Sequence, residues 1–312
     1  MGEMFKVRTD LAVEAREDVQ LPDREIQGVI VEEKENEHTN IHVTKITITN
    51  EHGARLLQKP VGTYLTLEAP DMAKFSEEYH REISCVLAEY IRDLIRPFWR
   101  EDGISILVVG LGNREVTPDA LGPNVVNNIS IRREARVGDQ QISINGIVPG
   151  VMAQTGMETA MIVKGVVRES KPDVVIAIDA LAARNTRRLN TTIQLTDTGI
   201  HPGSGVGNHR QAITKESIGT NVVAIGVPTV IDTPTIVYDT LENLLKSLSV
   251  SQHFRAVSDT FRKFNENEKY QLIRELIAPE MADMFVTPKD ADENIKRIGY
   301  TISEAINIAT DV

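Results

Sequence analysis

Short, nearly continuous apolar runs in the middle of the chain predict strands that are covered on both faces. These runs span 104–109, 174–178 and 222–226. Apolar positions near 156–169 and 233–248 recur at helical spacing and lie between or after the runs. Alternation of strands and helices favours parallel strands joined by right-handed crossovers. We therefore predict an α/β fold with a mainly parallel central sheet flanked by helices.

Toward the N-terminus the pattern predicts a β-rich segment. Polar and apolar residues alternate in 41–49, which is typical of a half-buried strand, and 25–31 and 63–69 are also strand-like. The charged segment 32–40 predicts a solvated turn between the first two strands. A helical pattern then extends from about 71 to 96.

Cys85 is the only cysteine among the 312 residues, and its place within that helical pattern predicts a buried, inert thiol. A single thiol cannot form an internal disulfide or a cysteine-rich metal site, which indicates a reducing compartment. The 34 basic and 45 acidic side chains give a formal charge of −11. This acidic balance argues against broad binding to nucleic acid or to anionic membranes.

The sequence also predicts a protein of the cell interior. Its first ten residues contain no apolar signal region, and no uninterrupted apolar run approaches the ~18 residues that span a bilayer. The last sixty or so residues predict helices with a break at 286–290. We expect a cytoplasmic protein without membrane contact.

Two acids follow buried strands, where open α/β sheets gather their reacting groups. Asp119 lies in the loop after the first strand, and Asp179 ends the second. One ionised carboxylate could accept a proton from water while a neighbouring protonated one donates to the leaving group. Alternatively, Asp119 caps a helix and backbone donors hold Asp179. Sequence spacing leaves both interpretations open.

The turn after the first buried strand is rich in glycine. Gly110, Gly112 and Asn113 could bring backbone donors to a substrate or to a developing oxyanion. Glu115 stands where a dinucleotide fingerprint requires its third glycine, so nicotinamide or flavin binding is not predicted. The sequence has no phosphate loop and no paired histidines of metal-site spacing, and we predict no cofactor and no metal.

A second glycine-rich loop spans 199–207 and contains His201, Gly203 and Gly205. Its amides could hold an anion or a peptide carbonyl, and His201 could carry a proton. The loop could equally be a tight connection in which His201 has a structural role.

Longer motifs give the chain a family resemblance. They lie at 109–113 (VGLGN), 116–123 (VTPDALGP), 148–152 (VPGVM), 171–182 (KPDVVIAIDALA), 190–208 (NTTIQLTDTGIHPGSGVGN) and 224–230 (AIGVPTV). They resemble the germination proteases of endospore-forming bacteria, and the similarity runs from about Arg8 to 286–289.

The resemblance implies a zymogen that trims its own N-terminus, assembles as a homotetramer and degrades small acid-soluble spore proteins in the spore core. It further implies catalysis by two aspartates, which match Asp119 and Asp179. The implied fold is of the phosphorylase and hydrogenase-maturation-peptidase type. A non-catalytic peptide- or anion-binding protein and a maturation-type peptidase are the alternatives.

The start of the chain resembles the cleavage sites of such spore proteins: an acid, an apolar residue, small residues and then Glu. Asp10, Leu11 and Glu14 fit this pattern, which predicts self-cleavage between Asp10 and Leu11. Residues 1–10 would then be a pro-segment. Alternatively, residues 11–13 simply begin a strand.

We expect residues 11–312 to form one peptidase domain. Its predicted parts are a β-rich portion (about 11–100), a catalytic core (about 101–250) and a helical tail (about 251–312). Basic partners for the acids of a substrate could come from Arg184, Arg187 and Arg188, or this run could be a solvated face.

Overall fold

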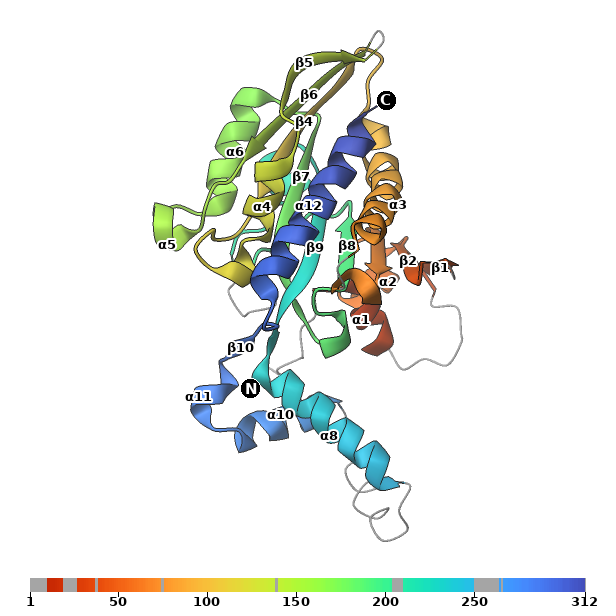
Figure 1. Cartoon of the computed structure of the whole chain (residues 1–312), viewed down its shortest axis with the longest axis vertical. Helices are drawn as coiled ribbons and strands as arrows, with labels where there is room; N and C mark the ends of the chain where they lie inside the picture. Colours follow the sequence, from red (N-terminus) through yellow and green to blue (C-terminus); the bar gives the residue numbers. More distant parts are fainter. Residues whose placement is uncertain are drawn as a thin grey trace.

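The computed structural model describes residues 10–18, 27–36, 39–73, 76–137, 140–203, 210–249, 264 and 266–311. Within them, one sheet orders its strands β1-β2-β3-β8-β9-β7-β4-β6-β5, and β10 pairs with β9 (Figure 1). The strands are β1 (Val29–Asn36), β2 (Ile41–Ile48), β3 (Gly62–Glu68), β4 (Gly103–Gly110), β5 (Arg132–Val137), β6 (Gln140–Ile147), β7 (Val174–Ala183), β8 (Thr192–Thr196), β9 (Asn221–Asp232) and β10 (Phe285–Val286).

The predicted α/β fold is confirmed, and its parallel part is the centre of the sheet. Strands β6, β4, β7 and β9 pair in parallel, whereas the strands outside them pair antiparallel. Successive residues of β4 enter two different cores: Ile106 and Val108 lie in one, Leu107 and Val109 in the other. This double burial explains why the three central strands have nearly continuous apolar sequences.

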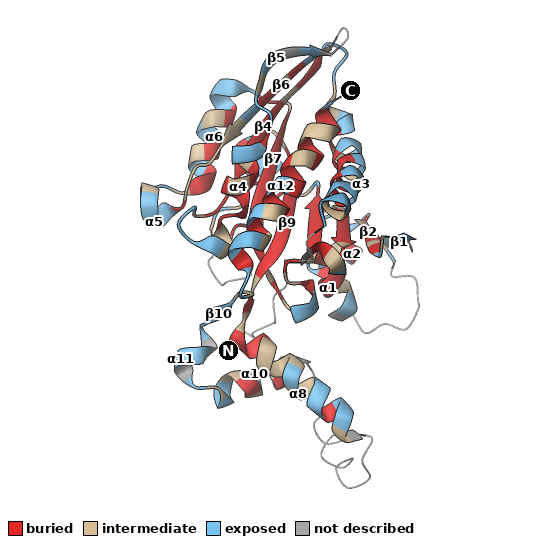
Figure 2. Cartoon of the chain, viewed as in Figure 1, coloured by how far each residue is buried: buried red, intermediate tan, exposed pale blue. Residues whose placement is uncertain are grey.

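Helices cover both faces of the sheet (Figures 1 and 2). The helices α3 (Glu77–Ile95), α4 (Leu121–Asn128) and α12 (Ala291–Thr310) bury apolar residues in the core on one face. The opposite core receives α6 (Thr159–Ser170), α7 (Lys215–Ile218), Leu11 and Val13. The chain start is therefore part of the packed protein.

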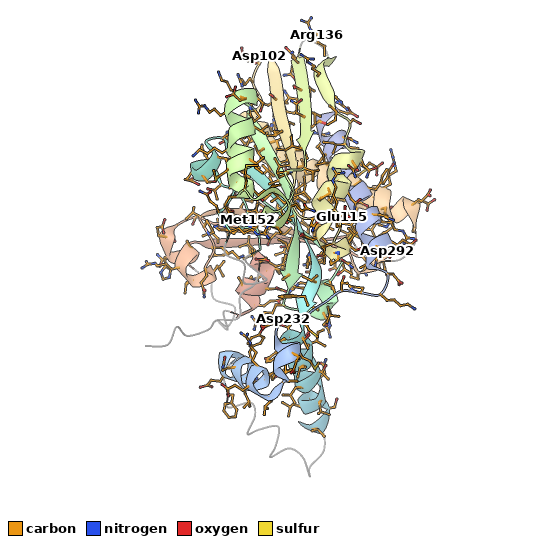
Figure 3. The ribbon with its side chains drawn as sticks, turned by 90° about the vertical axis from the view of Figure 1, so that its left-hand side faces the viewer. Asp102, Glu115, Arg136, Met152, Asp232 and Asp292 are labelled. Atoms are coloured by element: carbon orange, nitrogen blue, oxygen red, sulfur yellow. The ribbon has the colours of Figure 1, made fainter. Side chains whose placement is uncertain are left out.

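A group of helices projects beyond one end of the sheet (Figure 1). It contains α8 (Thr233–Ser249), α10 (Glu266–Leu276) and α11 (Pro279–Ala282), after which α12 returns to the sheet. Figure 3 places Asp102, just before β4, at the opposite end from Asp232, the last residue of β9. The parallel strands thus run toward the projecting helices.

Two local expectations are wrong, those for 32–40 and for Cys85, and a third, for 71–96, is confirmed only in part. The predicted turn at 32–40 is largely strand, because β1 continues to Asn36 as an exposed, charged edge strand paired with β2. The pattern at 71–96 contains a short 3-10 helix (Pro70–Ala73) and then α3, which begins only after Ser76 caps it by accepting the N–H of Tyr79. Cys85 is exposed because it lies on the outer face of α3.

The helix α1 (Ala12–Asp18) forms where a strand was the alternative for residues 11–13. Its first turn is closed by the N–H of Ala15, which donates to the carbonyl of Leu11. Two further short helices are α2 (Glu51–Leu57) and α5 (Met152–Thr155). Residues 10–18 are called the N-terminal segment below.

Candidate active site

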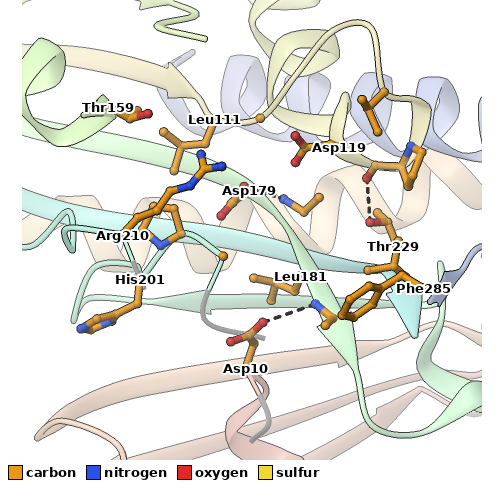
Figure 4. Close-up of a pocket in the computed structure, with 18 residues that line it drawn as sticks. Asp10, Leu111, Asp119, Thr159, Asp179, Leu181, His201, Arg210, Thr229 and Phe285 are labelled. Carbon is orange, nitrogen blue, oxygen red and sulfur yellow. Dashed lines mark hydrogen bonds between the residues drawn. The ribbon is translucent and has the colours of Figure 1, made fainter. Parts of the chain in front are cut away.

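A pocket of about 290 Å³ opens where β4 ends its pairing with β7 (Figure 4). Asp119 and Asp179 both line it, as do Asp10, His201 and Arg210. The walls thus combine the loop after β4, the strand β7, the region after β8 and the start of the chain. The fold brings the two acids of the sequence prediction, the aspartate pair, into one cavity.

Asp179 lies within β7 rather than at its end. Strand β4 stops pairing with β7 at Gly110 and Ile178, while β7 continues along β9 to Ala183. Asp179 is therefore the first β7 residue beyond the edge left by β4. It is 5% exposed, and its Oδ1 accepts the N–H of Ala180 at 3.0 Å.

Asp119 ends a short 3-10 helix (Thr117–Asp119) and does not cap α4, whose N-cap is Ala120 without a side-chain bond. Its Oδ2 instead accepts the N–H of Asn113 at 2.8 Å, closing the loop after β4. The hydroxyl of Thr229, on β9, donates to the carbonyl of Pro118 at 2.7 Å and ties this loop to the sheet (Figure 4).

Steric crowding explains why glycine occupies two positions of the turn after β4. Gly112 adopts a φ of +104°, and a Cβ there would lie 2.0 Å from the carbonyl oxygen of Asp119. A Cβ at Gly110 would lie 2.3 Å from the carbonyl oxygen of Gly122 in α4. These glycines allow the loop and α4 to approach β4 closely. Their proposed role as substrate or oxyanion donors stays a prediction.

The two carboxyl groups of the aspartate pair have different electrostatic surroundings, which shift their pKa values to different extents. Burial raises the pKa of Asp179 well above its ordinary value, and the negative charges of Asp119 and Asp10 raise it further. Burial also raises the pKa of Asp119, but the N–H of Asn113 and the charge of Arg210 oppose this shift. Asp179 is thus the member of the pair that favours its protonated form most strongly.

We expect Asp179→Asn to raise the melting temperature at neutral pH. Since the folded pKa lies above the unfolded one, protonation of Asp179 stabilises the fold in acid, and this contribution is lost as pH rises through the folded pKa. An asparagine at this position cannot ionise, so the variant does not lose stability in this way as pH rises. Thermal unfolding across a pH series should show the gain over the unaltered protein shrinking toward acid. The exposed Asp102, at the opposite end of the sheet, provides an Asp→Asn control; an equal gain there would contradict the assignment.

The N-terminal segment is bound residue by residue. A carboxylate oxygen of Asp10 accepts the N–H of Ala182 at 3.3 Å (Figure 4). Leu11 and Ala12 are completely buried, and Leu11 belongs to the same apolar core as Leu181. The carboxylate of Glu14, itself 2% exposed, accepts the backbone N–H groups of residues 184 and 185.

Of the three candidate arginines, Arg188 contacts this segment through its guanidinium. Its guanidinium lies 3.4 Å from Glu14 and 2.6 Å from Glu17, and it donates through Nε to Glu68 at 2.9 Å. Arg187 is exposed, and Arg184 contributes the backbone N–H that reaches Glu14. Arg188 thus binds the acid that follows the predicted scissile bond by four positions.

The second glycine loop is only partly described. His201 is exposed and lines the pocket, as does Gly203, whose φ is +74°. Gly205 lies outside the described residues. Within the described part of the chain, no cluster of three or more His, Cys, Asp or Glu residues could hold a metal ion.

Three polar residues of the site were not predicted from the sequence. Lys59 and Gln194 donate to the carbonyl of Asp10, and Arg210 faces the aspartate pair. None of the three carried a sequence signal, because the complete burial of the stretch 192–196, within which the polar Gln194 is unusual, is known only from the structure.

No helix among the described residues is long and apolar enough to cross a membrane. A search of solved structures finds a [NiFe] hydrogenase maturation protease, HycI from Thermococcus kodakarensis, at 16% identity. The match covers 70% of this chain and 98% of that protein, with a TM-score of 0.33. A TM-score this low supports no argument about fold or mechanism.

Sequence comparisons identify the relatives of the chain. The germination protease family model matches residues 7–263. A germination protease of Caldanaerobacter subterraneus subsp. tengcongensis is 47% identical over 97% of this chain and 94% of its own length. Those of Clostridium perfringens (strain SM101) and Bacillus subtilis (strain 168) are 41% and 40% identical, each over 98% of this chain and over 95% and 93% of their own lengths. The chain belongs to the germination protease family.

Proposed function

We propose that this peptidase starts the degradation of small acid-soluble spore proteins, and that it is made as a zymogen that cuts itself between Asp10 and Leu11. Its site of action would be the cytoplasm of the forespore and the spore core. The observation that carries the proposal is the pocket in which Asp10 lies together with Asp119 and Asp179. A predicted cleavage position and two candidate catalytic groups thus occupy one cavity.

The aspartate pair would divide the chemistry of hydrolysis. Asp119, with the N–H of Asn113 and the charge of Arg210 favouring its ionised form, accepts a proton from the attacking water. Asp179, whose environment favours protonation, donates to the nitrogen that leaves. This division follows from the different surroundings of the two carboxyl groups.

The contacts of the N-terminal segment supply a model for the substrate. A side-chain acid before the cut accepts the N–H of Ala182, and an apolar residue after it enters the core that contains Leu181. An acid four positions beyond the cut meets Arg188 and two backbone N–H groups. A spore protein with the same order of residues could use the same contacts.

Homotetramer formation remains part of this proposal. The projecting helices and the turn after them expose large apolar side chains, including Leu244, Leu276, Met281 and Met284. Neighbouring apolar side chains of this kind are commonly covered by a partner.

The proposal is tested by incubating the purified full chain alone and with a small acid-soluble spore protein, and by determining every new N-terminus. We expect a new terminus at Leu11 in the chain, and cuts in the spore protein after an acid that is followed by an apolar residue. Absence of both products would overturn the proposal. A strong chelator is included, because loss of activity on chelation would point to a metal-dependent maturation-type peptidase.

A further inference from the structure

The carbonyl oxygen of Asp10 is held by two side chains from separate elements. Lys59 Nζ, in the connection between α2 and β3, donates to it at 2.9 Å, and Gln194 Nε2, on β8, donates at 3.1 Å. The Oε1 of the same glutamine accepts the N–H of Ala12 at 2.6 Å. The Gln194 amide therefore bridges the backbone on both sides of the peptide bond between Asp10 and Leu11.

We propose that Lys59 and Gln194 are catalytic residues that stabilise the oxyanion formed when this bond is hydrolysed. The inference rests on the proposed self-cleavage and adds to it the groups that receive the developing charge. The donors differ from the glycine-loop amides suggested by the sequence. They come from the β-rich N-terminal part and from β8, outside the loop that carries Asp119.

The reaction places a charge on the oxygen that these groups contact. Water adds to the carbonyl carbon of Asp10 and loses one proton to the base, while the π electron pair moves onto the carbonyl oxygen. Collapse re-forms the C=O bond and breaks the bond to the nitrogen of Leu11, which takes a proton from the acid. The products are a carboxyl group on Asp10 and an amino group on Leu11.

A lysine ammonium and an amide N–H bind this oxyanion more strongly than the uncharged carbonyl. Hydrogen bonds to a charged partner are roughly twice as strong as those between neutral groups. Only the part of an interaction that grows in the transition state accelerates the reaction. Burial lowers the pKa of the Lys59 ammonium, while the nearby negative charges of Asp10 and Glu14 act in the opposite direction.

The alternative to a catalytic role is that these contacts are purely structural. Lys59 and Gln194 could simply anchor the N-terminal segment, in which case their loss would release the segment and slow cleavage indirectly. However, Leu11 and Ala12 are completely buried and Glu14 is 2% exposed, so the segment has other anchors. Removal of Lys59 alone should therefore leave the segment docked and remove mainly the stabilisation of the oxyanion.

The test follows the first-order appearance of the Leu11 terminus in the full chain. We expect Lys59→Met and Gln194→Leu each to slow it about 10²- to 10³-fold, as observed when single oxyanion donors are removed elsewhere. Lys59→Arg, which keeps the charge, should recover most of the rate. The controls are Lys164→Met, at an exposed position of α6, and Thr192→Val, on β8 at a hydroxyl without a partner among the described residues.

Hydrogen exchange separates catalysis from anchoring. In an Asp119→Asn background, where we expect cleavage to be about a thousandfold slower, the amides of Ala12 and Ala15 report on the docked segment. Protection retained in Lys59→Met together with a slow rate supports the oxyanion role. Protection lost in parallel with the rate, or a rate within about threefold of the unaltered chain, overturns it. If the unaltered chain never cuts itself, the proposed self-cleavage fails and this inference with it; if it cuts and Lys59→Met cuts as fast, only this inference fails.

Discussion

Replacement of Asp119 or Asp179 by asparagine is expected to slow self-cleavage, and cleavage of a spore protein, about a thousandfold. Each substitution removes a proton acceptor or donor but keeps the size of the side chain and an oxygen for the N–H of Asn113 or Ala180. Positioned general acids and bases commonly contribute about 10²- to 10⁴-fold in rate. The loss should therefore appear without loss of the fold.

The measurement compares initial rates of both reactions and the melting temperatures of the variants. Asp197→Asn is the matched control, because its carboxylate also accepts a backbone N–H, that of Thr63, yet it does not line the pocket. Full activity in both Asp119→Asn and Asp179→Asn would exclude an aspartate mechanism while leaving the peptidase assignment intact. Equal losses in all three variants would indicate a general effect on folding.

The central sheet was predictable because burial on both faces leaves a strong sequence signal. Strands β4, β7 and β9 contain short apolar runs, and no surface-facing residues interrupt them. The strand β8 was not predicted, although all five of its residues are buried. Its threonines and Gln194 are polar, and their burial depends on neighbouring strands and on the N-terminal segment.

The positions of the two acids followed from a rule about sheets rather than from spacing. Reacting groups gather at the carboxyl ends of parallel strands, and the fold places Asp119 and Asp179 in one pocket there. Lys59 and Gln194 reach the same region through tertiary packing between distant parts of the chain. Such contacts have no local pattern, so sequence analysis could not identify them.

The binding of the N-terminal segment was only half predictable. The sequence predicted self-cleavage between Asp10 and Leu11. It also indicated Arg188 as one of three arginines that could bind the acids of a substrate. It did not reveal that Glu14, Glu17 and Glu68 converge on one guanidinium. The three glutamates come from two elements that meet only in the folded chain, so their common partner is a property of the tertiary structure.

Arg188→Met is expected to destabilise the protein by about 3–5 kcal/mol, the usual cost of removing one partner from a buried ion pair. The Arg188 side chain is 8% exposed and that of Glu14 is 3% exposed, so the substitution removes the guanidinium that lies 3.4 Å from a buried carboxylate. Burial alone would lower the pKa of Arg188, but Glu17, Glu68 and Glu14 together raise it above its ordinary value. The guanidinium is therefore stabilised by its partners in the folded state.

A double-mutant cycle with Glu14→Gln isolates this interaction, with Arg187→Met, at the exposed neighbouring position, as the control. Because the neutral amide of the Glu14→Gln variant no longer needs a cation, adding Arg188→Met to that variant should cost less than Arg188→Met costs alone. Chemical unfolding measures each stability in the Asp119→Asn background, which keeps the N-terminal segment intact. Similar losses for Arg187→Met and Arg188→Met, or simple additivity in the cycle, would contradict a buried coupling. A coupling energy between Arg188 and Glu14 would show that charge holds α1 against the 3-10 helix Thr186–Arg188, in addition to the apolar packing of Leu11.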